Sequence, residues 1–454
     1  MATAATLPVV GPGARDLLRR AGALSPVLAV LALLLVPGGG GGAEGGTGGT
    51  GTVADAASGL LVLVCLVRVA RGGARPLTRT AAVVLGLPVL GICLAAITSN
   101  DPASSLPGVA RYVQVFVLVP AAVLLTVRDR RDFAVVAWAL VGLALLQGAV
   151  GVAQYLTGTG ASYQGEDIRA VGTFGATDVM GMATVVSYGL VVVTGIALGS
   201  GPGRARTAAL VCAGLLFLPL VLSFSRGAWI ATVFACALQL LLAGPRRAAR
   251  VALAAGALGV VLVGGLGIGS DLVEERVTSI TRVTAAPDQS VTDRYTMWAA
   301  AGEMWRAEPL TGVGLKGFPR YRDAHASVAL SSGSDTAGAG AGFRRQPLLS
   351  PHNMYLLVLS EQGLVGLLAL VGSWTALLVG ALRRRGGTGT GTGTGTGFGP
   401  GSGPGADCAL VAAGLLVWQL VDFFYADIGG PSTVLMAVVF GLAAWWSLVG
   451  ARRA

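Results

Sequence analysis

Hydrophobic residues in this chain of 454 residues come in runs of about 20, separated by short polar segments. An apolar helix of about 20 residues crosses the ~30 Å hydrocarbon core of a bilayer. The runs are too long and too continuously apolar for barrel strands, and helices satisfy their own backbone hydrogen bonds. The pattern predicts an all-α polytopic membrane protein with about 12 transmembrane helices. We expect the spans at 24–37, 53–70, 80–98, 107–127, 132–155, 176–199, 207–224, 227–243, 249–268, 356–382, 406–425 and 431–449.

One polar interruption, at 269–351, is much longer than the others and divides the spans into nine and three. Loops of this length are uncommon without structure or purpose. Within it, Met297, Trp298, Ala301, Met304 and Trp305 recur at helical spacing and predict a helix that lies on the membrane surface. The predicted organisation is a basic cytoplasmic tail (1–23), nine helices (24–268), a large external loop (269–351) and three helices (352–450) with a Gly/Thr-rich cytoplasmic linker (386–405).

Composition and charge agree with this interpretation. Hydrophobic residues make up 54% of the chain and charged residues only 12%, about half the charged share of a soluble protein. Arginines gather in alternate loops, which predicts a multi-pass protein of the plasma membrane with both termini cytoplasmic. The net charge of +10 is then mainly an orientation signal, and no nucleic-acid partner is implied.

A few arginines break the alternation and fall on the predicted outer side. Arg226, in Ser-Phe-Ser-Arg-Gly-Ala-Trp, stands between two hydrophobic runs, where a guanidinium costs a few kcal/mol unless it snorkels or pairs. It is either an interfacial anchor beside Trp229 or an anion site, because a guanidinium grips phosphate oxygens with two hydrogen bonds. Arg169 and Arg294 are also external, and Arg294 is either solvated beside Asp293 or part of the same anion site.

His352 lies where the long loop meets the tenth span, and His325 is the only other histidine. An imidazole at this boundary is a candidate proton acceptor, and the alternative is an interfacial histidine without a chemical role. Tyr355 lies on the same helical face as His352. Glu361 and Asp422 are candidate buried acids, for which the sequence leaves both helix-packing hydrogen bonds and a proton role open.

The sequence does not predict a metal or a cofactor, because no Asp-x-Asp pair or His/Asp cluster has the spacing of metal ligands. The Gly-x-Gly-x-x-Gly spelling at 312–317 follows no predicted strand, so we interpret it as a tight turn rather than a dinucleotide site.

Taken together, these segments resemble the O-antigen ligase and O-antigen polymerase family over about residues 165–370. The resemblance is carried by Ser-Arg-Gly-Ala-Trp around Arg226, by Arg294 with Trp298 four residues later, by Glu-Pro-Leu-Thr-Gly-Val-Gly-Leu-Lys-Gly-Phe at 308–318, and by Pro-His-Asn-Met-Tyr-Leu around His352. The stretch 169–175 adds to it. Asp178 departs from the family, whose members often have asparagine there.

The resemblance implies a membrane glycosyltransferase with its active site on the outer face of the membrane. Its donor would be a glycan on undecaprenyl diphosphate, and its acceptor a hydroxyl of a glycan, lipid or protein, with no metal or cofactor. His352 would be the catalytic base, Arg226, Arg294 and Arg169 would bind the diphosphate, and Asn353, Tyr355 and Trp298 would support them. The resemblance does not separate ligase from polymerase.

A second class of function remains open from the helix count alone. Twelve helices with both ends inside also describe a transporter or flippase of lipid-linked glycans or small solutes. That class predicts two related halves, whereas the long loop divides this chain nine to three.

Overall fold

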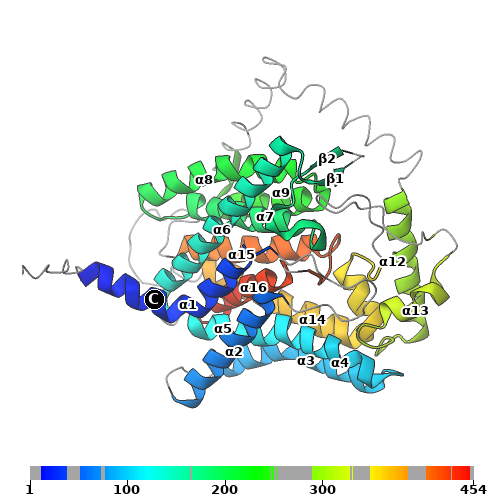
Figure 1. Cartoon of the computed structure of the whole chain (residues 1–454). Coiled ribbons are helices and arrows are strands. Elements are labelled where there is room, and N and C mark those ends of the chain that lie inside the picture. The colour runs from blue at the N-terminus through cyan, green and yellow to red at the C-terminus, as the bar shows by residue number, and fades with distance from the viewer. Residues whose placement is uncertain are drawn as a thin grey trace, which may run out of the picture.

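The computed structural model describes residues 12–37, 52–72, 77–163, 166–246, 289–327, 348–386, 405–430 and 432–449, with single residues at 248, 249, 253 and 330. Long helices lie side by side in a bundle, and α12 and α13 lie at one end of it (Figure 1). The first elements are α1 (Pro12–Leu33), α2 (Val53–Ala70), α3 (Arg79–Thr98), α4 (Pro102–Val113), η1 (Gln114–Leu118), α5 (Val119–Thr126) and α6 (Arg130–Thr157). The next are β1 (Ala161–Tyr163), β2 (Glu166–Arg169), η2 (Gly172–Thr177), α7 (Gly181–Leu198), α8 (Gly203–Leu222) and α9 (Arg226–Ala243). The last are α12 (Gln289–Ala307), α13 (Phe318–His325), α14 (Met354–Gly386), α15 (Ala406–Asp422) and α16 (Ser432–Leu448).

The described residues contain 8 helical segments long and apolar enough to cross a membrane, which confirms a polytopic helical membrane protein. They are α2, α3, α4 to α5 through η1, α6, α7, α8, α9 and α14. Three further predicted spans correspond to the apolar part of α1 (Gly22–Leu33), to α15 and to α16, which are shorter. The predicted span 249–268 falls almost entirely outside the described residues, so the count of twelve stays a prediction.

The centre of the bundle consists of helices buried in protein rather than in lipid. In the 18-residue apolar stretch of α7, 78% of residues are buried in the protein, against 22% in that of α2. Helices α15 and α16 lie beside α7 in the middle of the bundle and are buried along nearly their whole length (Figure 1). Large apolar side chains of α2 and α8 are exposed on the outside, where lipid can cover them.

Two features between α6 and α7 differ from the sequence prediction. Strands β1 and β2 pair as an antiparallel hairpin, which the all-α prediction did not include. Helix α7 begins at Gly181, five residues after the predicted start at 176, because residues Gly172–Thr177 form the short 3₁₀ segment η2.

Helix α12 runs across the direction of the bundle helices (Figure 1). The face that was expected to lie on the membrane surface instead packs inside the protein: Met297, Ala301 and Met304 are buried, and α12 contacts α14. The expectation of a lipid-facing surface is wrong for these three residues, because α14 offers an apolar partner that the sequence pattern could not reveal.

Helix α14 is broken at Gly363, whose backbone has φ +64° and ψ −166°. The loop after α12 fills the break, since the amides of Leu364 and Val365 donate to the carbonyls of Pro309 and Leu310 at 2.9 and 3.2 Å. The amides of Val313 and Gly314 donate in return to the carbonyls of Ser360 and Glu361 at 2.9 and 3.0 Å. Non-helical backbone at membrane depth is tolerated when protein satisfies it in this way.

The glycine-rich stretch 312–317 is therefore a turn, as interpreted from the sequence. Gly312 and Gly314 have φ values of +67° and +99°, which favour glycine. A side chain at Gly312 would collide with the backbone of α14, because an added Cβ would lie 2.4 Å from the carbonyl carbon of Glu361.

We expect Gly363→Ala to destabilise the protein strongly. An added Cβ would lie 2.3 Å from the carbonyl carbon of Leu310, and the positive φ adds strain of about 1–3 kcal/mol. The measurement is thermal unfolding in detergent, followed by gel filtration. Gly142→Ala in α6 is the control, because nothing lies within 4 Å of its added Cβ. Equal melting temperatures for the two variants would contradict the close packing of the loop after α12 against the break in α14.

Candidate active site at the start of α14

The backbone around His352 is held in an uncommon conformation. His352 has φ +49°, and among the described residues only Phe224 and Lys316 share a positive φ without being glycine. Such a conformation costs about 1–3 kcal/mol and persists where surrounding contacts fix it. Here the amide of Met354 donates to the carbonyls of Phe423 at 2.9 Å and Ala426 at 3.1 Å. The backbone beside His352 is therefore tied to the segment that follows α15.

Asn353 and Tyr355 strengthen this tie. The Oδ1 atom of Asn353 accepts the amide of Leu356 at 3.0 Å and so caps α14, while its Nδ2 donates to the carbonyl of Phe424 at 3.2 Å. The hydroxyl of Tyr355 donates to the carbonyl of Leu420 at 2.7 Å, and its ring packs against that of Phe424 with centroids 4.7 Å apart. Both side chains join the start of α14 to the end of α15.

Trp298 connects the loop helix to the same place. Its Nε1 donates to the carbonyl of Pro351 at 2.8 Å, and its ring packs edge-on against Tyr295. Arg294 lies one helical turn before Trp298 on α12. The contact between Trp298 and Pro351 therefore brings Arg294 toward the segment that carries His352.

Arg226 is the first residue of α9, and the preceding serines explain why the helix begins there. Ser225 is the N-cap, and its side chain accepts the amide of Ala228 at 3.3 Å. Trp229 donates from Nε1 to the carbonyl of Leu220 at 2.8 Å, which fixes the angle between α8 and α9. An added Cβ at Gly227 would lie 3.1 Å from the Cβ of Tyr425, so this helix start touches the segment after α15.

The electrostatics of these groups show that they lie near one another. Burial lowers the pKa of Arg294, the charge of Arg226 lowers it further, and the charge of Asp427 raises it. Burial also lowers the pKa of His352, which Asp427 raises and Arg294 lowers. We call Arg226, Arg294, His352 and Asp427 the outer cluster, after the side of the membrane on which the sequence predicts them.

Asp427 is the member of the outer cluster that the sequence analysis missed. It lies in the short connection between α15 and α16, a segment whose sequence stands out only by its lack of basic residues. Its Oδ2 atom is buried and has no hydrogen-bond partner among the described residues. An acid next to an apolar span on the same side as His352 was the available clue.

Arg169, the last residue of β2, donates hydrogen bonds to the residue after α8 and to the residue before α7. Its Nε donates to the carbonyl of Ser223 at 3.0 Å and its Nη2 to the sulfur of Met180 at 3.1 Å. The neighbouring amide of Ala170 donates to the carbonyl of Leu222 at 3.1 Å. Strand β2 thereby braces the end of α8, three residues before Arg226. The structure thus assigns Arg169 a bracing contact, and a diphosphate contact stays a prediction.

The acids left open by the sequence make packing contacts. Glu361 accepts the amide of Phe318 at 3.2 Å through Oε1, which links α14 to α13. Asp178 accepts the amide of Ser432 through Oδ2 at 3.0 Å, which fixes the start of α16. Asp422 is buried at the end of α15, where its carbonyl accepts the amides of Tyr425 and Ala426. These contacts favour helix packing for Glu361 and Asp178.

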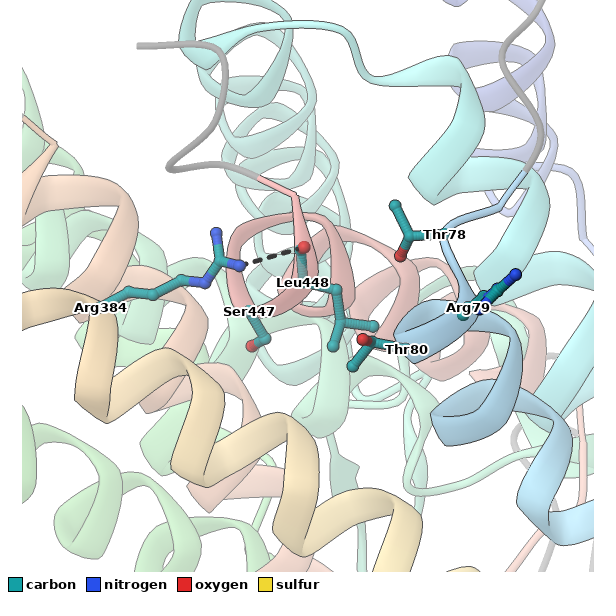
Figure 2. A pocket seen from close by; sticks show the side chains of 6 residues that line it. All are labelled: Thr78, Arg79, Thr80, Arg384, Ser447 and Leu448. Carbon is teal, nitrogen blue, oxygen red and sulfur yellow. Dashed lines mark hydrogen bonds between the residues drawn. The ribbon is translucent and has the colours of Figure 1, made fainter.

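A cavity of about 340 Å³ lies at the opposite ends of the helices, where α3 begins and α14 and α16 end. Figure 2 shows Arg384 donating to the carbonyl of Leu448 on one side of it and Thr78 and Thr80 on the other. This cavity contains no member of the outer cluster. In the part of the chain that the structure describes, no group of three or more His, Cys, Asp or Glu could hold a metal ion.

Residues 211–371 match the family model described as O-antigen ligase, which is an enzyme family. The matched region contains Arg226, Arg294 and His352 and ends within α14. A search of curated proteins gave no match.

We expect Trp298→Phe to loosen the backbone around His352, because phenylalanine cannot donate to the carbonyl of Pro351. The measurement is hydrogen exchange by mass spectrometry, in which the peptide containing 350–357 should exchange faster. Trp305→Phe is the matched control on the same helix, since Trp305 donates to Pro309 instead. Unchanged exchange in Trp298→Phe would contradict the role of this contact.

Proposed function

We propose that this protein, whose residues 211–371 match the O-antigen ligase family model, transfers a glycan from undecaprenyl diphosphate to a hydroxyl group. The acceptor is a hydroxyl of another glycan, a lipid or a protein. The observation that supports this most directly is the series of interacting charges at the start of α14, where Arg294 acts on His352 and Arg226 acts on Arg294.

The two arginines suit a diphosphate. Neither guanidinium has a hydrogen bond or an ion pair to protein among the described residues, although Arg294 is half-buried. A half-buried guanidinium near the positive charge of the exposed Arg226 is unfavourable without an anion. Arg226 also stands at the N-terminus of α9, where free backbone amides favour a phosphate group. A diphosphate would satisfy both guanidinium groups and these amides.

His352 suits the acceptor side of the reaction. Its lowered pKa keeps the imidazole neutral near pH 7, so it can take a proton from the acceptor hydroxyl. The hydroxyl oxygen then bonds to the anomeric carbon while the bond from that carbon to the diphosphate oxygen breaks. The electron pair leaves with the diphosphate, and a single displacement inverts the anomeric configuration.

The arginines supply the charge stabilisation that this step needs. Preorganised cations aimed at developing negative charge are usually the largest catalytic contribution. Arg226 and Arg294 would stabilise the departing diphosphate, so that the proposed reaction uses no divalent ion. Asn353, Tyr355 and Trp298 act through the backbone, since their hydrogen bonds fix the segments that carry His352 and Arg294.

We place this site on the outer face of the plasma membrane. Basic residues gather at the other ends of the helices, where Arg20 and Arg128 pair with Asp132 at 3.1 and 2.9 Å. Positive residues favour the cytoplasmic side. Both termini are then cytoplasmic, and the outer cluster faces the compartment in which the lipid-linked glycan is exposed.

The direct test uses purified protein with a lipid diphosphate-linked glycan, with and without candidate acceptors, and separates the products on a gel. A ladder from donor alone indicates a polymerase, and a single shift with acceptor indicates a ligase. His352→Ala should lower the transfer rate by about 10²–10⁴-fold while the donor still binds. His325→Ala is the control, because His325 bonds to the carbonyl of Tyr321 on α13. Transfer at the normal rate by His352→Ala would reject the base, and absence of any glycosidic product from the wild type would favour a carrier.

Arg226→Ala should weaken binding of the diphosphate donor. A hydrogen bond to a charged group contributes about 1.5–3 kcal/mol, which corresponds to roughly a 10- to 100-fold loss of affinity. Arg204→Ala is the matched control, because Arg204 is an exposed arginine in the first turn of α8 at the other side of the bundle. Donor affinity is measured with the immobilised lipid, and equal affinities for both variants would count against a diphosphate site at Arg226.

A further inference from the structure

Asp427 has a buried carboxylate oxygen that plays no part in the proposed reaction. One of its carboxylate oxygens, Oδ2, is buried without a hydrogen-bond partner in the described part of the chain. A buried polar atom without a partner costs free energy and calls for an explanation, such as a catalytic role. The helix-packing contacts that account for Glu361 and Asp178 do not account for this oxygen.

The backbone brings Asp427 next to His352. The amide of Met354 donates to the carbonyl of Ala426 at 3.1 Å, and Asp427 follows Ala426 directly. His352 precedes Met354 by two residues. On the other side of His352, the carbonyl of Pro351 accepts a hydrogen bond from Nε1 of Trp298. The carboxylate therefore lies where the starts of α14 and α9, the loop helix α12 and the end of α15 converge.

The charges around His352 are unbalanced without this carboxylate. The charge of Arg294 on α12 acts on His352, and the charge of Arg226 on α9 acts on Arg294. Asp427 is the acid that acts on both His352 and Arg294. Asp422 and Glu361 are the other acids within electrostatic reach of Asp427. Glu361 already accepts the amide of Phe318.

We propose that Asp427 is a positioning residue whose carboxylate pairs with the imidazolium that His352 becomes on taking the acceptor proton. This inference rests on the proposed function. The proton moves from the hydroxyl oxygen to the ring nitrogen, and the ring gains one positive charge beside two guanidinium groups. Three cations together would oppose the transfer, and the carboxylate offsets one of them. The charge of the same carboxylate also acts on the guanidinium of Arg294.

The chain offers a direct readout because it has only two histidines. Histidine-selective isotope labelling and NMR in detergent give the titration of His352 and His325 separately, and His325→Gln assigns the signals. In Asp427→Asn, which keeps the size of the side chain, the pKa of His352 should fall while that of His325 stays. In Arg294→Gln the pKa of His352 should rise, because a neighbouring positive charge has been removed. These opposite directions separate a charge effect from a general loss of structure.

Kinetics complete the test. The transfer rate of Asp427→Asn should fall at least about 10-fold with little change in donor affinity. The acidic limb of its pH–rate profile should move to lower pH, because the pKa of His352 falls. Asp427→Glu should recover part of the rate, since it restores the charge. An unmoved His352 titration in folded Asp427→Asn would overturn the inference. The proposed function would fail separately, if the wild type formed no glycosidic product.

Discussion

The amide of Met354 makes the contact on which the site depends. By donating to the carbonyls of Phe423 and Ala426, it joins the start of α14 to the end of α15. Asn353 and Tyr355 add side-chain hydrogen bonds across the same junction. The left-handed backbone of His352 is stable only because these bonds, together with the one from Trp298 to Pro351, fix both of its neighbours. A histidine in a free loop would not be held near Arg294 in this way.

The broken helix α14 anchors the loop that carries Arg294. The turn at 309–314 exchanges backbone hydrogen bonds with residues 360–365, so the far end of α12 is fixed inside the bundle. Its middle is fixed at Pro351 through Trp298. Polar backbone is thereby kept satisfied at membrane depth, and the loop helix becomes a rigid part of the site. Catalysis by preorganised charge requires this rigidity, because cations that reorient during the reaction stabilise it less.

The sequence predicted the parts of this protein that depend on local pattern. Apolar runs located the long helices, and short motifs indicated Arg226, Arg294 and His352 as candidate site residues. It did not predict contacts between distant segments, such as the burial of Met297 and Met304 against α14. Asp427 was missed for the same reason, since one acid in a short connection has no pattern until Ala426 is seen bonded to Met354. The hairpin β1–β2 is too short for strand periodicity to reveal.

The convergence of α9, α14 and the segment after α15 is the central claim, and a disulfide bond tests it most directly. An added Cβ at Gly227 would lie 3.1 Å from the Cβ of Tyr425, so a backbone shift of a few tenths of an ångström would bring the pair into the range of about 3.5–4.5 Å found in disulfides. Gly227→Cys combined with Tyr425→Cys, in a background without the five native cysteines, should therefore form an intramolecular disulfide under mild oxidation. Mass spectrometry of proteolytic peptides would show the crosslinked pair. Two free thiols in the folded double variant would contradict the convergence of Arg226 with the His352 segment.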